Sequence, residues 1–265
     1  MHYRPLGNTG YQVSAVVYGG IISSDEGQAA SDRYVSWALD RGINCFDVAP
    51  TYRDAEEKLG RSLIPYRKDV YLACKTTQRM KADAEKELKR SMELLVKRKQ
   101  EGAVRKIGFS AHAQQAALQC LALYPFDTVL FPMNYQLDMS EGIGREVARR
   151  KEQLGFGLLG MKTLIERAWR DEGEREASPY PKSWCKPFDR ADKALRIAAM
   201  RYTLAMGADV LVPPGNYENF SFMVDHVDQV LQTPLTGEDK ALLAERYAMV
   251  SEQPFFLKNN GGWEK

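Results

Sequence analysis

The chain alternates short β-rich runs with longer stretches of helical periodicity, and this alternation constrains the fold more than any other feature. Seven runs are expected to be strands: VSAVVYG, INCFDVAP, VYLACKT, AVRKIGFS, TVLFPMNY, FGLLGMKT and ADVLVPPG. The stretches between them place apolar side chains three or four residues apart, as amphipathic helices do. Strands and helices that alternate at this spacing favour parallel strands joined by crossover helices, here after an N-terminal hairpin.

Polar residues recur at the carboxyl ends of the expected strands. These positions are Asp47, Lys75, Ser110, Asn134, Lys162 and the turn Pro213–Gly215. In a (β/α)8 barrel such ends open onto one face, where catalytic residues gather from several loops. An open doubly wound sheet is the rival fold, but the first run lacks a GxGxxG turn into its helix. We therefore expect an α/β, TIM-type (β/α)8 barrel, formed as a single domain by residues 1–265.

Composition narrows the class of partner. The chain has 265 residues, 44% of them hydrophobic, which is enough for one large barrel core. Its net charge is only +2 and its Lys and Arg are scattered among Asp and Glu, so neither a nucleic-acid footprint nor a membrane surface is indicated. A small-molecule partner is expected, and the sequence gives no signal for an oligomeric state.

Cysteine usage and the N-terminus favour a cytoplasmic protein. The four cysteines form no CxxC pair, and Cys45 and Cys74 lie inside apolar runs, where a thiol behaves as a small hydrophobe. The N-terminal MHYRPLGNTG is polar and Gly-rich, unlike the apolar core of a secretory leader. No window approaches the roughly 18 apolar residues that a membrane span requires.

Asp47, Tyr52 and Lys75 form the strongest candidate for chemistry. Asp47 lies near the end of an apolar run, and a buried carboxylate needs a partner. Lys75 closes the next run, so neighbouring strands would bring it to Asp47 and Tyr52. The ammonium would favour the phenolate of Tyr52 and make that phenol a general acid near neutral pH. Taken singly, Asp47 is a helix cap, Tyr52 covers a loop and Lys75 is a solvated strand end, but the combined spacing favours catalysis.

These motifs resemble the aldo-keto reductase family. The resemblance begins with PLGNTGYQVS, continues through FDVAPTYRDAEEKLG and LACKT, and returns in EGAVRKIGFSAH and the Pro-Gly-Asn turn after the last run. It implies a barrel that binds extended NADPH or NADH without a Rossmann domain, and a hydride transfer to the carbonyl of an aldehyde or ketone. It further implies that Tyr52 protonates the oxygen, that Lys75 lowers the pKa of Tyr52, and that Asp47 anchors Lys75.

The same resemblance implies cofactor contacts for NADP(H) or NAD(H). Ser110 matches a serine that binds the nicotinamide carboxamide, and Asn134 lies near the strand end that assists it. Pro132 stands where many members have a glutamine. Met161 and Lys162 stand where the family packs against the nicotinamide ring and approaches the phosphates, although a core role suits Met161 equally.

PPGNYENF supplies the nucleotide end of this expected site. Gly215, Asn219 and the nearby backbone N–H groups stand at a helix start, which is a natural anion site. No arginine follows in the first helical turn, so the sequence does not choose between NADP and NAD. No metal site is expected.

The chain departs from the family between Leu95 and Val96, where SMELL runs directly into VKRKQEGAVRKIG. Members carry their active-site histidine on a strand at this point, so one βα unit of about 30 residues is absent. Either a segment is omitted from the sequence, or the helix over about 82–101 crosses directly to AVRKIGFS and leaves a seven-stranded, open or strained barrel. The histidines present are His2, His112 and His226. A helix start or the surface is the expected place for His112.

Three functions follow as hypotheses. The first is an NAD(P)H-dependent carbonyl reductase, and the second is a binding or regulatory protein that keeps the cofactor site but turns over poorly. A barrel hydrolase is the weakest, because no metal-ligand cluster or Ser-His-Asp set is present. The polar insert Glu166–Arg190 is expected to shape the pocket, with Trp169 and Trp184 contacting a substrate or simply packing. TGEDKALLAERYAMV is expected to be a capped helix.

Overall fold

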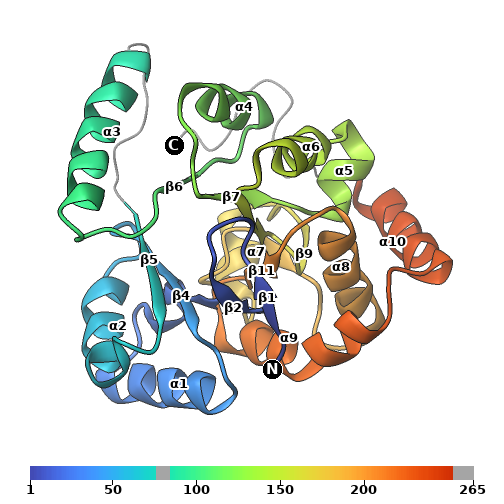
Figure 1. Cartoon of the computed structure of the whole chain (residues 1–265). Coiled ribbons are helices and arrows are strands. Elements are labelled where there is room, and N and C mark those ends of the chain that lie inside the picture. The colour runs from blue at the N-terminus through green and yellow to red at the C-terminus, as the bar shows by residue number, and fades with distance from the viewer. Residues whose placement is uncertain (76–83, 253–265) are drawn as a thin grey trace.

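The fold was analysed in a computed structural model, which describes residues 1–75 and 84–252. Parallel strands form an inner layer, and helices cover its outer side (Figure 1). The parallel strands are β3 Tyr18–Gly19, β4 Cys45–Val48, β5 Tyr71–Cys74, β6 Gly108–Ser110, β7 Thr128–Pro132, β8 Gly157–Met161 and β11 Val210–Leu211. These strands fall within the seven expected runs. Thr76, the last residue of the third run, lies outside the described residues.

The parallel strands form one curved sequence of neighbours. One sheet has the order β5-β4-β3 and the other has the order β11-β8-β7-β6. A parallel bridge between Val16 and Leu211 joins the two sheets, supported by a hydrogen bond of 3.0 Å from the Val17 N–H to the Leu211 carbonyl. All carboxyl ends therefore open onto the same face, as a barrel requires.

Helices follow most of the strands. They are α1 Gln28–Asp40, α2 Ala55–Leu63, α3 Ala84–Gln100, α4 Gln114–Leu123, α5 Tyr135–Glu141, α6 Arg145–Leu154, α8 Lys193–Ala205, α9 Tyr217–Gln232 and α10 Gly237–Val250, with short 3-10 helices η1 Gly20–Ser23 and η2 Ile64–Tyr66. The expected N-terminal hairpin is β1 Tyr3–Pro5 with β2 Gln12–Ser14. The insert forms β9 Ile165–Arg167, α7 Glu172–Ala177 and β10 Lys186–Pro187.

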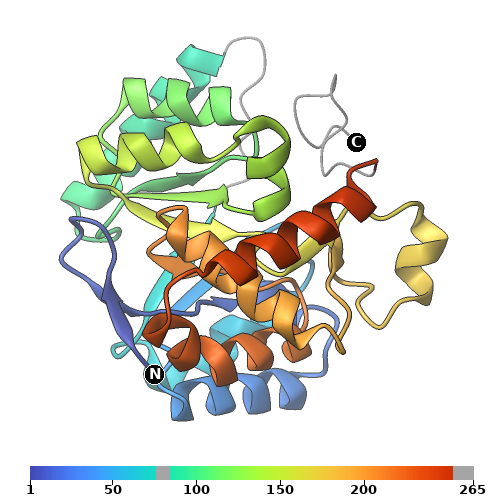
Figure 2. The same cartoon turned by 90° about the vertical axis from the view of Figure 1, so that its right-hand side faces the viewer.

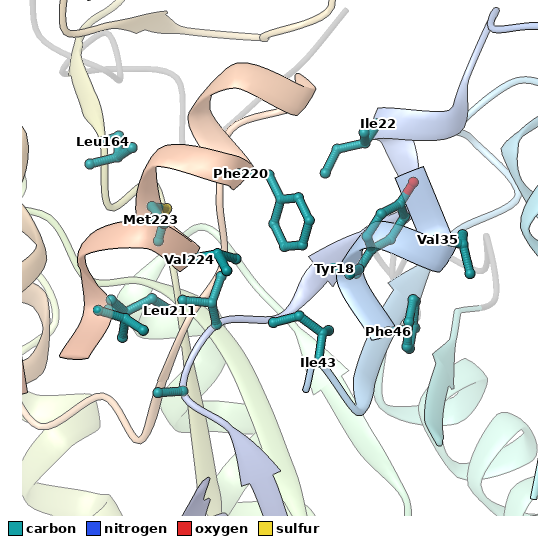
Figure 3. Packing of buried hydrophobic residues seen from close by; sticks show 14 of the residues in the cluster. Tyr18, Ile22, Val35, Ile43, Phe46, Leu164, Leu211, Phe220, Met223 and Val224 are labelled. Carbon is teal, nitrogen blue, oxygen red and sulfur yellow. The ribbon is translucent and has the colours of Figure 1, made fainter. Parts of the chain in front are cut away.

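The largest apolar cluster lies between the strands and helices α1, α2 and α9. Figure 3 shows Phe220 of α9 and Tyr18 of β3 facing one another, and their rings meet edge to face with centroids 5.2 Å apart. Phe46 of β4 lies at the same distance on another side of Tyr18. The Tyr18 hydroxyl pairs with Ser23 at 2.8 Å, so this buried phenol keeps a hydrogen bond.

A second cluster fills the inner side of the strands. Leu130, Leu159 and Val210 contribute to it from three strands, Val17 contributes from the position before β3, and Leu6 of the hairpin segment packs against them. At Gly157 in β8 an added Cβ would lie 2.5 Å from the Leu6 side chain, so this close approach requires glycine. The hairpin thus covers the amino end of the strands and leaves the carboxyl face for a site.

The predicted eight-stranded closure is not present in the described residues. Strand β5 pairs with β4 and β6 pairs with β7, but over their described residues β5 and β6 do not pair with each other. Helix α3 instead leads directly towards β6, as the second explanation for the short connection proposed (Figure 1). Both facing edges remain accessible: Ala73, Cys74, Gly108 and Ser110 are exposed, whereas every residue of β4 is buried. Cys74 is exposed, so the expectation that its thiol lies inside an apolar run as a small hydrophobe is wrong: among the described strands, β5 pairs with β4 alone.

The C-terminal helix has the predicted cap. Thr236 accepts a hydrogen bond of 3.0 Å from the Asp239 N–H, and the Asp239 side chain accepts one from the Thr236 N–H, which completes a capping box. Figure 2 shows α10, in red, lying along α8. Within the described ranges, none of the helices is long and apolar enough to span a membrane.

Candidate active site

The predicted polar positions lie together at the carboxyl face. Asp47 is in the last half of β4, Lys75 follows β5, and Ser110 ends β6. Asn134 follows β7 and Lys162 follows β8, while Pro213–Gly215 follows β11. Because these strands are parallel neighbours, residues far apart in sequence share one face, and the convergence predicted from the sequence pattern is confirmed.

Lys75 is the partner of Asp47. Parallel pairing sets Asp47 opposite Ala73 and Val48 opposite Cys74, so Lys75 follows directly on the adjacent strand. Its ammonium donates a hydrogen bond to Asp47 Oδ2. Asp47 is only 4% exposed, and its burial raises the pKa of this carboxyl group while the Lys75 charge opposes that rise. Burial alone would lower the pKa of Lys75, but the nearby carboxylate raises it, so the lysine stays charged.

Tyr52 completes a three-residue chain. The Lys75 ammonium lies 3.4 Å from the Tyr52 oxygen and 5.1 Å from the centre of its ring. The loop after β4 holds Tyr52 there, because the Ala55 N–H at the start of α2 donates to the Tyr52 carbonyl at 3.0 Å. Chemically, the arrangement is a phenol that contacts a cation anchored by a buried anion.

The pKa of Tyr52 differs from the sequence expectation. Burial raises it above the ordinary value of 10.0, and the Asp47 charge raises it further. Lys75 does act to lower it, as predicted, but these two effects are larger. The expected net lowering towards neutral pH is therefore corrected: Tyr52 keeps its proton throughout the physiological range.

Asn134 fixes the turn after β8. Its amide nitrogen donates to the Lys162 carbonyl at 2.8 Å and to the Ile165 carbonyl at 2.9 Å, and its oxygen accepts from the Gln136 N–H. Both amide hydrogens are thus engaged with backbone in this fully buried side chain. Lys162 itself has a positive φ of 70°, a strained conformation that occurs at functional sites and that the Asn134 bonds help to hold. A cofactor contact by Asn134 stays a prediction.

Ser110 and Met161 border the same face. Ser110 is exposed at the end of β6, beside the unpaired edge, and so is accessible to a ligand. Met161 is half-buried and packs against the inner apolar cluster, so it belongs in part to the core. Their contacts with a nicotinamide stay predictions.

Around the start of α9, the described part of the chain leaves several buried donors without a hydrogen-bond partner. Asn216 caps the helix by accepting from the Asn219 N–H at 2.8 Å, and the buried Asn219 oxygen accepts from Arg196 at 2.8 Å. The amide nitrogens of both asparagines and Nε of Arg196, which is 1% exposed, have no hydrogen-bond partner within the described residues. A helix N-terminus with unpaired buried donors is suited to an acceptor-rich ligand. The sequence analysis missed Arg196 because it lies within the apolar helix segment LRIAAM.

One short segment of the insert, Lys182–Cys185, contacts three parts of this face. The Trp184 ring meets Tyr52 edge to face, with centroids 5.6 Å apart. Cys185 Sγ accepts a hydrogen bond of 3.4 Å from the Lys162 ammonium. A Cβ added at Gly215 would lie 3.2 Å from the Lys182 carbonyl oxygen. The insert therefore borders the site, as predicted, but no sequence pattern indicated Lys182 or Cys185.

The ion pair between Arg167 and Glu174 holds the first half of the insert. It leads to a prediction about how the stability of the fold depends on pH. The Arg167 guanidinium beside Glu174 lowers the pKa of that carboxyl to about 2 from 4.5. A carboxyl group whose pKa is lowered on folding stabilises the folded chain at pH values above its pKa in the unfolded chain. This stabilisation is lost as the pH falls towards 2. We expect Glu174→Gln to lower the free energy of unfolding by about 1–3 kcal/mol at pH 7. Urea unfolding at several pH values measures this cost, and a cost that did not shrink between pH 4.5 and 2 would contradict it.

Comparison with solved structures shows the fold. The holo form of an aldo-keto reductase from Bacillus halodurans matches with a TM-score of 0.67 and 17% identity, over 98% of this chain and 99% of that one. The chain has the aldo-keto reductase fold. A protein of Pseudomonas aeruginosa assigned as an aldo-keto reductase matches with a TM-score of 0.62 and 19% identity, over 86% and 96%. A thermostable aldo-keto reductase bound to the inhibitor epalrestat gives 0.61 and 17%, over 93% and 100%.

Comparison with family models and with curated proteins does not identify this fold. None of the protein-family models matches the chain, and none of the curated proteins matches it significantly.

Proposed function

We propose that the protein is an NAD(P)H-dependent carbonyl reductase that converts an aldehyde or ketone to an alcohol. The chain of contacts from Asp47 through Lys75 to Tyr52, placed at the carboxyl face of the strands, is the observation that carries the proposal. When bound, the reduced nicotinamide supplies the hydride that the carbonyl carbon receives. The carbonyl oxygen takes the proton of the Tyr52 hydroxyl, so the products are the alcohol and the oxidised cofactor, and solvent later returns the proton to Tyr52.

The pKa of Tyr52 suits this role. An alkoxide is a much stronger base than a phenolate, so a phenol protonates the developing alkoxide without needing a pKa near neutrality. Lys75 lies 3.4 Å from the Tyr52 oxygen and stabilises the phenolate left after the transfer. Asp47 holds the ammonium in place from a buried position. This arrangement assigns proton donation to Tyr52, charge stabilisation to Lys75 and positioning to Asp47.

Several residues of the face suit a nicotinamide nucleotide. The α9 N-terminus and the amide nitrogens of Asn216 and Asn219, which have no partner among the described residues, would contact its nucleotide end, beside Gly215. Lys162 would approach its phosphates, and Ser110 with Met161 would border the nicotinamide ring. NADP(H) and NAD(H) are both compatible with these residues.

The proposal is tested by turnover and by binding. We expect purified protein to oxidise NADPH or NADH in the presence of a panel of aldehydes and ketones. The alternative, a cofactor-binding protein with impaired catalysis, is favoured by the absent βα unit and predicts calorimetric binding of the cofactor without turnover across the panel. Neither binding nor turnover with either cofactor would reject both proposals.

The pH dependence of reduction provides a further prediction. Tyr52 donates in its protonated form, and burial raises its pKa above 10.0. We therefore expect kcat for carbonyl reduction to stay level from about pH 6 to about pH 9 and to fall only above pH 10. Steady-state rates at saturating cofactor and substrate measure this profile. A fall centred near neutral pH would instead indicate that Lys75 dominates and lowers the pKa of Tyr52.

A further inference from the structure

Trp184 places a partly exposed indole beside the proposed proton donor. Its ring plane is inclined at 63° to that of Tyr52, with the centroids 5.6 Å apart, and the residue is 41% exposed. A large apolar side chain left in water gains free energy when a ligand covers it. Because the two rings are in contact, a molecule whose carbonyl met the Tyr52 hydroxyl would lie close to the indole.

The backbone around Trp184 is held on both sides. Before it, the Trp169 indole N–H donates to the Ser183 carbonyl at 2.8 Å, and Lys182 forms an ion pair with Glu26. After it, the Ser183 hydroxyl donates to the Cys185 carbonyl at 2.6 Å. Lys162, directly after β8, donates a hydrogen bond to the Cys185 sulfur. These contacts connect the segment Lys182–Cys185 to the turn after β8 and to the loop before α1. The segment therefore forms a wall of the site whose side chains need little further ordering when a ligand binds.

Two of the charged groups around this wall are in ion pairs. Lys75, next to the Tyr52 hydroxyl, is paired with Asp47, and Lys182, in the segment that carries Trp184, is paired with Glu26. An anionic or cationic substrate would have to compete with these pairs. A neutral apolar group instead covers the exposed part of the indole, and an aromatic group also forms a ring contact with it.

We propose that Trp184 is a specificity-determining residue, and that it selects neutral aldehydes and ketones whose carbonyl is attached to an aromatic ring. This inference rests on the proposed reductase function. The substrate ring lies against the indole while its carbonyl oxygen meets the Tyr52 hydroxyl. Trp184 contributes binding and orientation, and it transfers neither proton nor hydride.

The test compares benzaldehyde with propanal, which is also a neutral aldehyde but lacks a ring, and each constant is compared between variant and wild type for the same substrate. For Trp184→Ala we expect KM for benzaldehyde to rise about tenfold, which corresponds to about 1.4 kcal/mol of lost binding. Its kcat, and both constants for propanal, should change less than twofold. Trp184→Phe keeps a ring and should retain most of the preference. The matched control is Tyr66→Ala, which truncates a partly exposed aromatic residue of η2. It should leave KM and kcat unchanged for both aldehydes.

Three results would overturn the assignment. Equal losses with both aldehydes would show that Trp184 only supports Tyr52, and unchanged constants would show that the indole does not contact the substrate. If the wild-type protein reduces neither aldehyde, the reductase proposal fails, and calorimetric titration with benzyl alcohol then tests the wall on its own. In that case binding by wild type and loss in Trp184→Ala would support the wall, whereas equal titration of both proteins would reject it.

Discussion

Tyr52→Phe is expected to lower kcat for carbonyl reduction by a factor of about 10²–10⁴, the range associated with loss of a positioned general acid. The substitution removes only the hydroxyl, so the ring contact with Trp184 and the cation above the ring remain. The Lys75 ammonium keeps Asp47 as its principal partner. The change therefore isolates the proton-donating atom from the packing that surrounds it.

Two controls make this result specific. Calorimetric affinity for NADPH or NADH should change little, because the phenol hydroxyl is not among the groups assigned to the nucleotide. Tyr66→Phe, on exposed surface, should leave kcat unchanged. The free energy of unfolding of Tyr52→Phe should fall by no more than about 1.5 kcal/mol, the net value of one hydrogen bond. Undiminished reduction of aldehydes by Tyr52→Phe would contradict the assigned mechanism.

The sequence predicted which polar residues share the carboxyl face better than it predicted the closure of the strands. Asp47 and Lys75 were identifiable because each is a charged residue at the end of an apolar run, and a buried charge demands a partner. Parallel register then brings the partners together without any sequence proximity. The sign of the Tyr52 pKa shift could not be predicted, because it depends on how deeply the loop buries the phenol relative to Lys75.

The opening between β5 and β6 has a different cause. Periodicity identifies helices and strands one at a time, whereas closure of a barrel depends on the number of strands and their shear. The long helix α3 and the strand β6 were both expected. Whether β6 pairs with β5 depends on how the whole set of strands packs, which periodicity does not describe. In the structure β6 stays with β7, through register pairs such as Ser110 with Leu130, and the edge of β5 is left exposed.

The insert was predicted to border the pocket, but its contacts were not predictable. Composition alone marked Trp184 as a candidate, since an aromatic side chain in a polar loop has either a packing or a binding role. The contact of Cys185 with Lys162 joins residues from β8 and the insert through a turn held by Asn134. Such contacts depend on loop conformation, which carries little periodic signal.

Lys75→Met is expected to destabilise the fold by about 3–5 kcal/mol at pH 7, because it leaves the buried Asp47 carboxylate without its cation. Burial already raises the pKa of Asp47, and removing the lysine raises it further. A carboxyl group whose pKa is raised on folding favours the folded state below its unfolded value of 3.8, and that contribution is lost as the pH rises. The penalty should therefore shrink as the pH falls towards 4.

A double substitution separates stability from catalysis at this pair. Asp47→Asn combined with Lys75→Met removes both charges, so most of the stability lost in Lys75→Met should return. Reduction should stay impaired, because no cation remains to stabilise the Tyr52 phenolate. Urea unfolding and kcat measured on the same proteins give both readouts, with Lys97→Met, from an exposed pair with Glu101, as the control. If Lys75→Met cost no more than this control, Asp47 would already be neutral in the fold and would not be the charged anchor of Lys75.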